Sequence, residues 1–137
     1  MTDLDLDKIV NGYLQCSLFT GVTDDGEPMD YIYTVDDFED SALDLALQEC
    51  AAFVVANQTD VEYMIGRQFS NGQGIVTNED VGIDLWYTSQ GHGTGFWDRE
   101  YRELGERLTE YCRHLPERNV FAPESDEFEN GSTLIIE

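Results

Sequence analysis

Apolar side chains recur every three or four residues in several stretches of the chain, which is the spacing of one helix face. This pattern predicts helices over residues 3–17, 40–56 and 100–114, and a shorter one over 61–66. Aspartate or serine stands at the start of the first two, where its side chain can cap the free backbone N–H groups. Pro116 closes the last helix, because proline cannot continue a helical hydrogen-bond ladder.

Alternating apolar and polar residues, rich in aromatic and β-branched side chains, indicate strands elsewhere. We expect one strand over residues 83–89 and a returning strand over 94–97, joined as a hairpin. Two more short strands are expected over 119–121 and 133–136, on either side of an acidic turn. The segment 31–35 is also rich in β-forming residues, and we expect it to hold the preceding polar loop against the body of the protein.

The expected elements follow the order α-α-(α)-β-β-α-β-β, which predicts an α+β fold with helices packed on one face of a small antiparallel sheet. A chain of 137 residues suits one domain, so we expect a single compact acidic domain over residues 1–137. Its apolar fraction of 41% and aromatic fraction of 12% support a packed core despite the high charge.

A glycine-rich turn stands between the predicted hairpin strands and carries the most distinctive residues of the chain. It comprises Gly91, His92, Gly93, Gly95, Phe96 and Trp97. A hairpin turn explains the glycines; a phosphate cradle would call for a following lysine, and Lys8 is the only lysine. His92 and Asp98 have the residue types needed for general acid–base chemistry, yet one such pair assigns no catalytic residue.

The run from residue 84 to residue 99 resembles a recurrent segment of small, acidic, uncharacterised proteins encoded by tailed bacteriophages. Those proteins carry an aromatic strand, an N-G-H-G-A-G-F-W-D-R-like turn and a short helix, and here Gln90 replaces the asparagine before the turn. Matching segments occur upstream in the same order, at residues 13–19, 26–30 and 49–53. The resemblance covers residues 10–115 and implies a viral origin and one compact domain, but no activity.

Acidic residues dominate the charge of the chain. Twenty-nine aspartates and glutamates oppose seven lysines and arginines, which gives a net charge of −22. Residues 1–66 hold fifteen acidic residues and one lysine, a net of −14, whereas 99–118 hold five arginines and five glutamates. Such a chain repels nucleic acid and anionic membranes and attracts basic surfaces. The expected partner is therefore a basic or nucleic-acid-binding host protein, and self-association stays open.

Two explanations of this charge remain open. In a halophilic host, an acidic and lysine-poor surface stays hydrated, and salt screens its self-repulsion. Alternatively, carboxylates can mimic the phosphates of DNA and occupy the DNA-binding groove of another protein, with affinity drawn from counterion release. The composition alone fits both explanations.

The carboxylates proposed for binding lie between the first two predicted helices and at the start of the second. They are Asp24, Asp25, Glu27, Asp30, Asp36, Asp37, Asp40 and Asp44. Four of them fall within residues 24–30, which raises the alternative of a calcium loop, but the residue spacing of an EF-hand is absent. We therefore expect no metal and no cofactor.

The remaining sequence features limit location and chemistry. Cys16, Cys50 and Cys112 are far apart and lie in predicted helices, which is typical of buried thiols in a reducing compartment. The amino terminus shows no secretory signal, and no apolar run reaches the ~18 residues of a membrane span. The expected location is the cytoplasm of the infected host cell.

Three classes of function fit the sequence. A non-enzymatic acidic binding protein, inhibiting a host defence or DNA-handling protein, is favoured by the charge. A structural or assembly protein of a virus of a halophile is the alternative. A small hydrolase-like enzyme using His92 and Asp98 is the third, and it is the least supported because no richer set of catalytic residues accompanies that pair.

Overall fold

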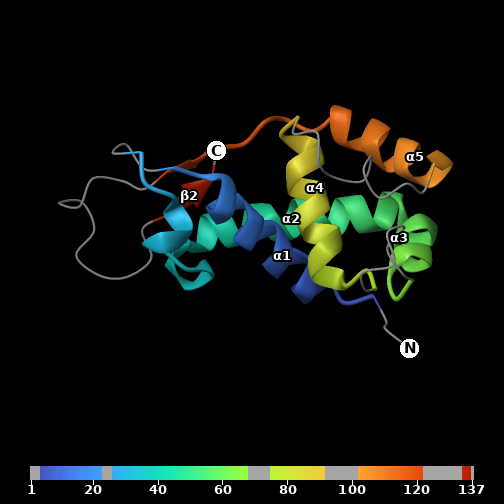
Figure 1. Cartoon of the computed structure of the whole chain (residues 1–137), viewed down its shortest axis with the longest axis horizontal. Coiled ribbons are helices and arrows are strands. Elements are labelled where there is room, and N and C mark those ends of the chain that lie inside the picture. The colour runs from blue at the N-terminus through green and yellow to red at the C-terminus, as the bar shows by residue number, and fades with distance from the viewer. Residues whose placement is uncertain (1–3, 23–25, 68–74, 92–101, 122–133, 137) are drawn as a thin grey trace.

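The structure is a computed structural model that describes residues 4–22, 26–67, 75–91, 102–121 and 134–136. Its described part is dominated by helices and includes one small antiparallel sheet (Figure 1). The elements are α1 (Leu6–Thr20), η1 (Met29–Tyr31), η2 (Val35–Asp37), α2 (Asp40–Ala56), α3 (Gln58–Met64), α4 (Asn78–Ser89), α5 (Arg102–Arg113), β1 (Val120–Phe121) and β2 (Ile135–Ile136).

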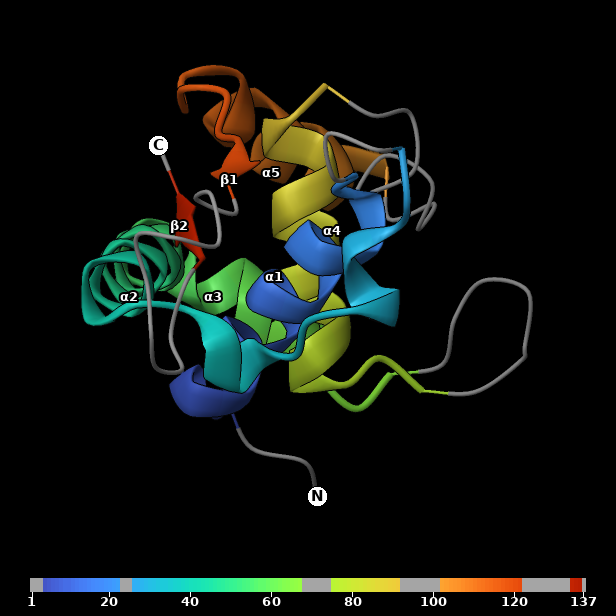
Figure 2. The same cartoon turned by 90° about the vertical axis from the view of Figure 1, so that its left-hand side faces the viewer.

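Helix α1 is the central element of the fold. Asp5 caps it, as predicted, by accepting a hydrogen bond from the backbone N–H of Lys8. Its buried side chains include Ile9, Tyr13 and Leu14, whose spacing places them against neighbours on more than one side. Figure 2 shows α1 lying between α2 and α4, and both helices contact it.

Two glycines allow α1 and α4 to approach at backbone distance. A Cβ atom added to Gly12 would lie 2.1 Å from the carbonyl oxygen of Glu79. One added to Gly82 would lie 1.9 Å from the carbonyl oxygen of Ile9 and 2.6 Å from the backbone nitrogen of Tyr13. Because these neighbours are backbone atoms, any side chain at either glycine must push the two helices apart.

The predicted strand over residues 83–89 is wrong, because this segment lies within α4. The helix begins with a capping box, in which Thr77 Oγ1 accepts from the Asp80 N–H and the Asp80 carboxylate accepts from the Thr77 N–H. The helix is buried on several sides, so its apolar residues do not form one narrow stripe. Their spacing resembles the apolar–polar alternation of a strand instead. The returning strand predicted over 94–97 lies outside the described residues.

Residues 31–35 also differ from expectation. Instead of a β-like segment, they belong to the two short 3-10 turns η1 and η2 and the residues between them. Tyr31 is 82% exposed and Ile32 is 50% exposed, so Met29 rather than these residues anchors the segment in the core. The prediction for α2 was correct in its extent, and Leu47 and Val55 on this helix are exposed.

The C-terminal strand pair is confirmed. Strands β1 and β2 are antiparallel, with Val120 opposite Ile136 and Phe121 opposite Ile135. The pair is too small to form the sheet on which we expected the helices to pack, and the described helices pack mainly on one another instead. Leu134 joins the same segment to the start of α2, because its N–H donates to the Asp37 carbonyl and its carbonyl accepts from the Glu39 N–H.

The core of the described chain includes all three cysteines. Cys16, Cys50 and Cys112 are buried and free, as predicted, and they lie in α1, α2 and α5. Burial raises the pKa of the Cys112 thiol to about 12, so this thiol stays protonated at neutral pH. Across the described ranges, we find no helix with the length and apolar character needed to cross a bilayer.

Helix α5 is held to α3 by an ion pair that the sequence did not suggest. The spacing of Glu103 and Arg107 would allow a pair along the helix. Arg107 instead binds both carboxylate oxygens of Asp60, at 2.9 and 2.7 Å. The side chain of Arg102 lies outside the described residues. Residues 60 and 107 are too far apart in sequence for helical spacing to reveal this contact.

This ion pair predicts a small pH effect. The hydrogen bonds from Arg107 lower the pKa of Asp60 below its ordinary value of 3.8, so the pair stabilises the fold above that pH. Its contribution is lost as the pH falls through the lowered pKa. A double-mutant cycle with Asp60→Asn and Arg107→Gln, followed by urea denaturation, should give a small coupling free energy at pH 7 and a smaller one at pH 2. Equal coupling at both pH values would contradict the assignment.

Candidate functional site

Some of the carboxylates predicted to bind a partner lie within the described residues, and they belong to one contiguous part of the chain. We call this set the acidic end: Glu27, Asp30, Asp36, Asp37, Asp40 and Asp44. Figure 1 places the segment from η1 to the start of α2 at the end of the long axis opposite α3 and α5. All six side chains except Asp37 are exposed, so this end presents a dense negative charge to solvent.

Several predicted residues cannot be placed. Asp24 and Asp25, and the turn residues His92, Gly93, Gly95, Phe96, Trp97 and Asp98, lie outside the described residues. Gly91 is described and has φ of 78°, a left-handed conformation that favours glycine. It directly follows α4 rather than a strand, so its role is to end a helix.

The backbone of the acidic end is organised by local hydrogen bonds. Tyr33 and Ile32 donate their N–H groups to the Met29 carbonyl, which closes the first turn over a buried methionine side chain. Asp37 accepts from the backbone N–H of Thr34 at 2.7 Å, which fixes the second turn. Phe38 is almost fully buried and attaches the start of α2 to the core. The exposed carboxylates therefore stand on an ordered scaffold.

Three of the described arginines pair with carboxylates outside the acidic end. Arg107 binds Asp60, Arg113 binds Glu110 and Arg118 binds Glu49. Among the described residues, no ion pair involves Asp30, Asp40 or Asp44. The negative charge of Asp30, Asp40 and Asp44 is therefore available to an external cation.

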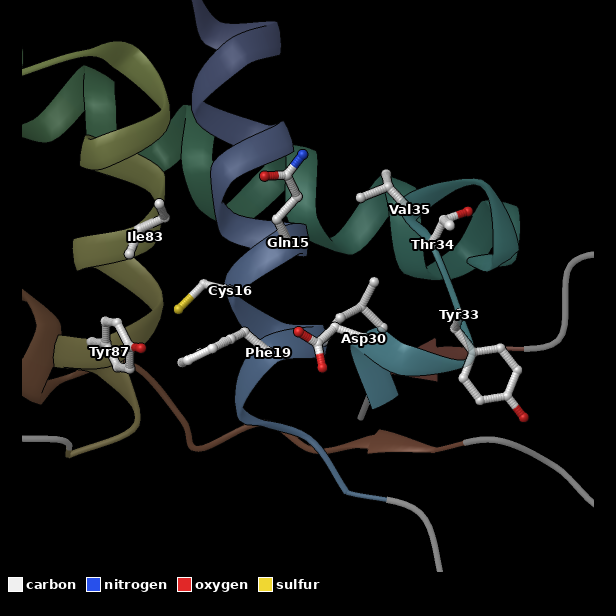
Figure 3. A pocket seen from close by; sticks show the side chains of 10 residues that line it. Gln15, Cys16, Phe19, Asp30, Tyr33, Thr34, Val35, Ile83 and Tyr87 are labelled. Carbon is white, nitrogen blue, oxygen red and sulfur yellow. The ribbon is translucent and has the colours of Figure 1, made fainter. Parts of the chain in front are cut away.

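A hollow of about 430 Å³ adjoins the acidic end, between α1, the two 3-10 turns and α4 (Figure 3). We call it the aromatic hollow. Its lining includes the aromatic rings of Phe19, Tyr33 and Tyr87, the carboxylate of Asp30 and the thiol of Cys16. Its volume is in the range of small-molecule and side-chain binding sites. Phe19 is 64% exposed, so a ring of this size stands open to solvent at the hollow.

The chemistry of the hollow is set by neutral walls and one acidic group. The thiol of Cys16 and the hydroxyl of Tyr87 are hydrogen-bonded to each other. Burial raises the pKa of the Cys16 thiol to about 12, and burial together with the thiol raises the pKa of Tyr87. Both groups stay neutral at pH 7, so the thiol is no nucleophile and the charge in the hollow comes from Asp30.

A second polar cluster lies inside the molecule. The Tyr13 hydroxyl donates to Glu49 Oε2, and Arg118 donates from Nε to Glu49 Oε1 at 3.0 Å. Burial, with the neighbouring carboxylate, raises the pKa of Tyr13. The Trp86 and Tyr13 rings pack edge-on with their centroids 5.2 Å apart, and the indole N–H of Trp86 donates to Thr20 Oγ1. These contacts join α1, α2, α4 and the segment after α5, and we assign them a structural role.

The sequence pattern predicts the carboxylates of the acidic end but not the aromatic hollow. Phe19 lay just beyond the predicted first helix, and Tyr87 was assigned to a strand, so nothing placed them together. The Thr77–Asp80 capping box was the signal that could have identified α4 and so turned Tyr87 towards α1. Within the described ranges, no group of three or more histidine, cysteine or acidic side chains has the arrangement of a metal site.

Comparisons of this chain with protein-family models, with curated proteins and with solved structures find no match.

Proposed function

We propose that this chain is a virus-encoded, non-enzymatic binding protein that presents its acidic end to a basic, nucleic-acid-binding protein of the host. The resemblance to acidic bacteriophage proteins supports the viral origin. The observation that carries the proposal is the arrangement of charge. Five of the six carboxylates of the acidic end are exposed on a hydrogen-bonded backbone, and Arg107, Arg113 and Arg118 form their ion pairs with other carboxylates.

Binding through such a surface would follow the physics of DNA binding. A DNA-binding groove is lined by basic side chains whose affinity for phosphates comes largely from the release of condensed counterions. Carboxylates fixed on an ordered backbone would present a negative surface to the same groove in place of the phosphates of DNA. The net charge of −22 also speeds the encounter with a cationic partner. We therefore propose DNA mimicry as the mode of inhibition.

An affinity capture from host lysate tests this proposal. The immobilised protein should retain basic, nucleic-acid-binding proteins at about 50 mM salt, and added duplex DNA should release them because it competes for the same groove. Retention should fall steeply by about 200 mM salt. The variant Asp40→Asn/Asp44→Asn should bind the captured protein on the order of tenfold more weakly, since each lost carboxylate removes one contact of this kind.

The matched control is Glu103→Gln/Glu106→Gln, which removes two exposed carboxylates from α5, away from the acidic end. This variant has the same net charge as the first and should lose much less affinity. Equal loss in the two variants would show that only total charge matters. A captured protein that DNA does not displace would contradict mimicry.

A further inference from the structure

We propose that the aromatic hollow receives an arginine side chain of the partner and so serves as the anchor point of the interface. This inference rests on the proposed function, because it specifies the contact by which the acidic end holds a basic partner. A surface made only of carboxylates attracts any cation. The aromatic hollow adds shape and chemistry that distinguish one kind of basic side chain from others.

The walls of the hollow suit a flat, weakly hydrated cation. Phe19, Tyr33 and Tyr87 come from α1, from the segment between the 3-10 turns and from α4, and all three residues line the hollow. Figure 3 shows Phe19 and Tyr87 on one side of Asp30 and Tyr33 on the other. A guanidinium stacks on aromatic faces and loses little hydration when it does so, whereas the ammonium of lysine is compact and strongly hydrated. The exposed ring of Phe19 offers such a face at the outer part of the hollow.

The charge of the hollow selects a cation as well. Asp30 contributes its carboxylate to the lining, and no ion pair between described residues involves it. A guanidinium can donate two parallel hydrogen bonds to one carboxylate, the geometry that makes such pairs strong and directional. An anionic ligand would meet Asp30 and the net charge of −22, and a purely apolar one would cover Asp30 without pairing it.

The surroundings of the hollow resemble the centre of a protein interface. Tyr31 and Ile32 stand exposed directly after Asp30, so apolar surface and carboxylates alternate within one short segment. Interfaces concentrate their binding energy in a few aromatic and arginine residues surrounded by a polar rim. Here the aromatic half of such a contact lies on this chain, and the partner would supply the arginine.

A titration with a defined probe tests the inference. The probe is N-acetyl-arginine amide, compared with its citrulline counterpart, which has nearly the same shape but no charge. In two-dimensional ¹H–¹⁵N spectra, the arginine probe should cause saturable shifts at the amides of Phe19, Asp30 and Tyr87. The citrulline probe should bind at least fivefold more weakly. Shifts spread evenly over the acidic end, or equal binding of both probes, would overturn the inference.

Matched variants separate the hollow from general electrostatics. Asp30→Asn should weaken binding of the arginine probe several-fold, whereas Asp44→Asn, which removes the same charge outside the hollow, should leave it nearly unchanged. Phe19→Ala should also weaken it, and Val55→Ala, at an exposed site on α2, should not. All four side chains are exposed, so folding should persist, and circular dichroism would verify it. Equal effects within either pair would contradict the inference.

The proposed function and this inference can fail separately. If the captured host protein binds Asp30→Asn and Phe19→Ala as tightly as the unchanged protein, but loses affinity for Asp40→Asn/Asp44→Asn, the inference is wrong and the proposed function stands. If the arginine probe occupies the hollow but neutralising the acidic end leaves capture unchanged, the inference stands and the proposed function is wrong.

Discussion

Replacing Gly82 by alanine should destabilise the protein by about 3 kcal/mol, the upper part of the range for overpacked cores. The added methyl group would lie 1.9 Å from the carbonyl oxygen of Ile9, and ordinary van der Waals contact begins near 3.4 Å. Neither backbone can yield alone, so α1 and α4 must separate along their shared contact. Alanine is intrinsically favoured over glycine in a helix by about 1 kcal/mol, which offsets only part of this cost.

Urea denaturation followed by circular dichroism would measure the effect, and the melting temperature should fall by about 10 °C. Gln48→Ala is the matched control, because it places the same residue at an exposed position of α2 and should leave stability almost unchanged. Gly12→Ala should resemble Gly82→Ala, since its methyl group would meet the Glu79 carbonyl oxygen at 2.1 Å. Full stability of both glycine variants would mean that the helices do not cross at backbone distance.

The close packing of α1 on α4 also explains which elements could be predicted from the sequence. Helix α1 has an aspartate cap and a stripe of apolar residues, and its prediction needed no knowledge of its neighbours. Helix α4 is different, because the polar residues Asn78, Asp84 and Ser89 are buried among its apolar ones. These polar residues interrupt the apolar stripe expected of a helix, so tertiary packing, rather than the local pattern, determined the outcome.

The candidate site divides in a similar way. The acidic end could be predicted, because exposed carboxylates that are near in sequence stay near in space when short turns connect them. The aromatic hollow could not, because its lining comes from three segments between residues 15 and 87, and their meeting depends on how α1 packs on α4. Pairings such as Arg107 with Asp60 had no sequence signal for the same reason. The acidic character of the site could be predicted from composition, but the shape of the aromatic hollow could not.

Removal of the Arg118 guanidinium should be the most damaging change in charge. The Glu49 side chain is only 10% exposed, and it accepts hydrogen bonds from both Arg118 and Tyr13. Arg118→Ala would leave a buried carboxylate with the tyrosine as its remaining described partner. Loss of one member of a buried pair costs about 3–5 kcal/mol, and because Arg118 is itself 23% exposed and water can enter, we expect about 2–3 kcal/mol.

A double-mutant cycle separates the buried charge from the lost contacts of the arginine. In a Glu49→Gln background, Arg118→Ala should cost less than half as much, because no charge is then left unpaired in the interior. Arg113→Ala is the matched control: its pair with Glu110 is exposed at both ends, and urea denaturation should detect no loss of stability. Equal losses for Arg118→Ala and Arg113→Ala would contradict a buried pair. The backbone N–H of Arg118 donates to Gln90 Oε1 at 2.7 Å, and because alanine keeps this N–H, Arg118→Ala removes only the contacts of the guanidinium.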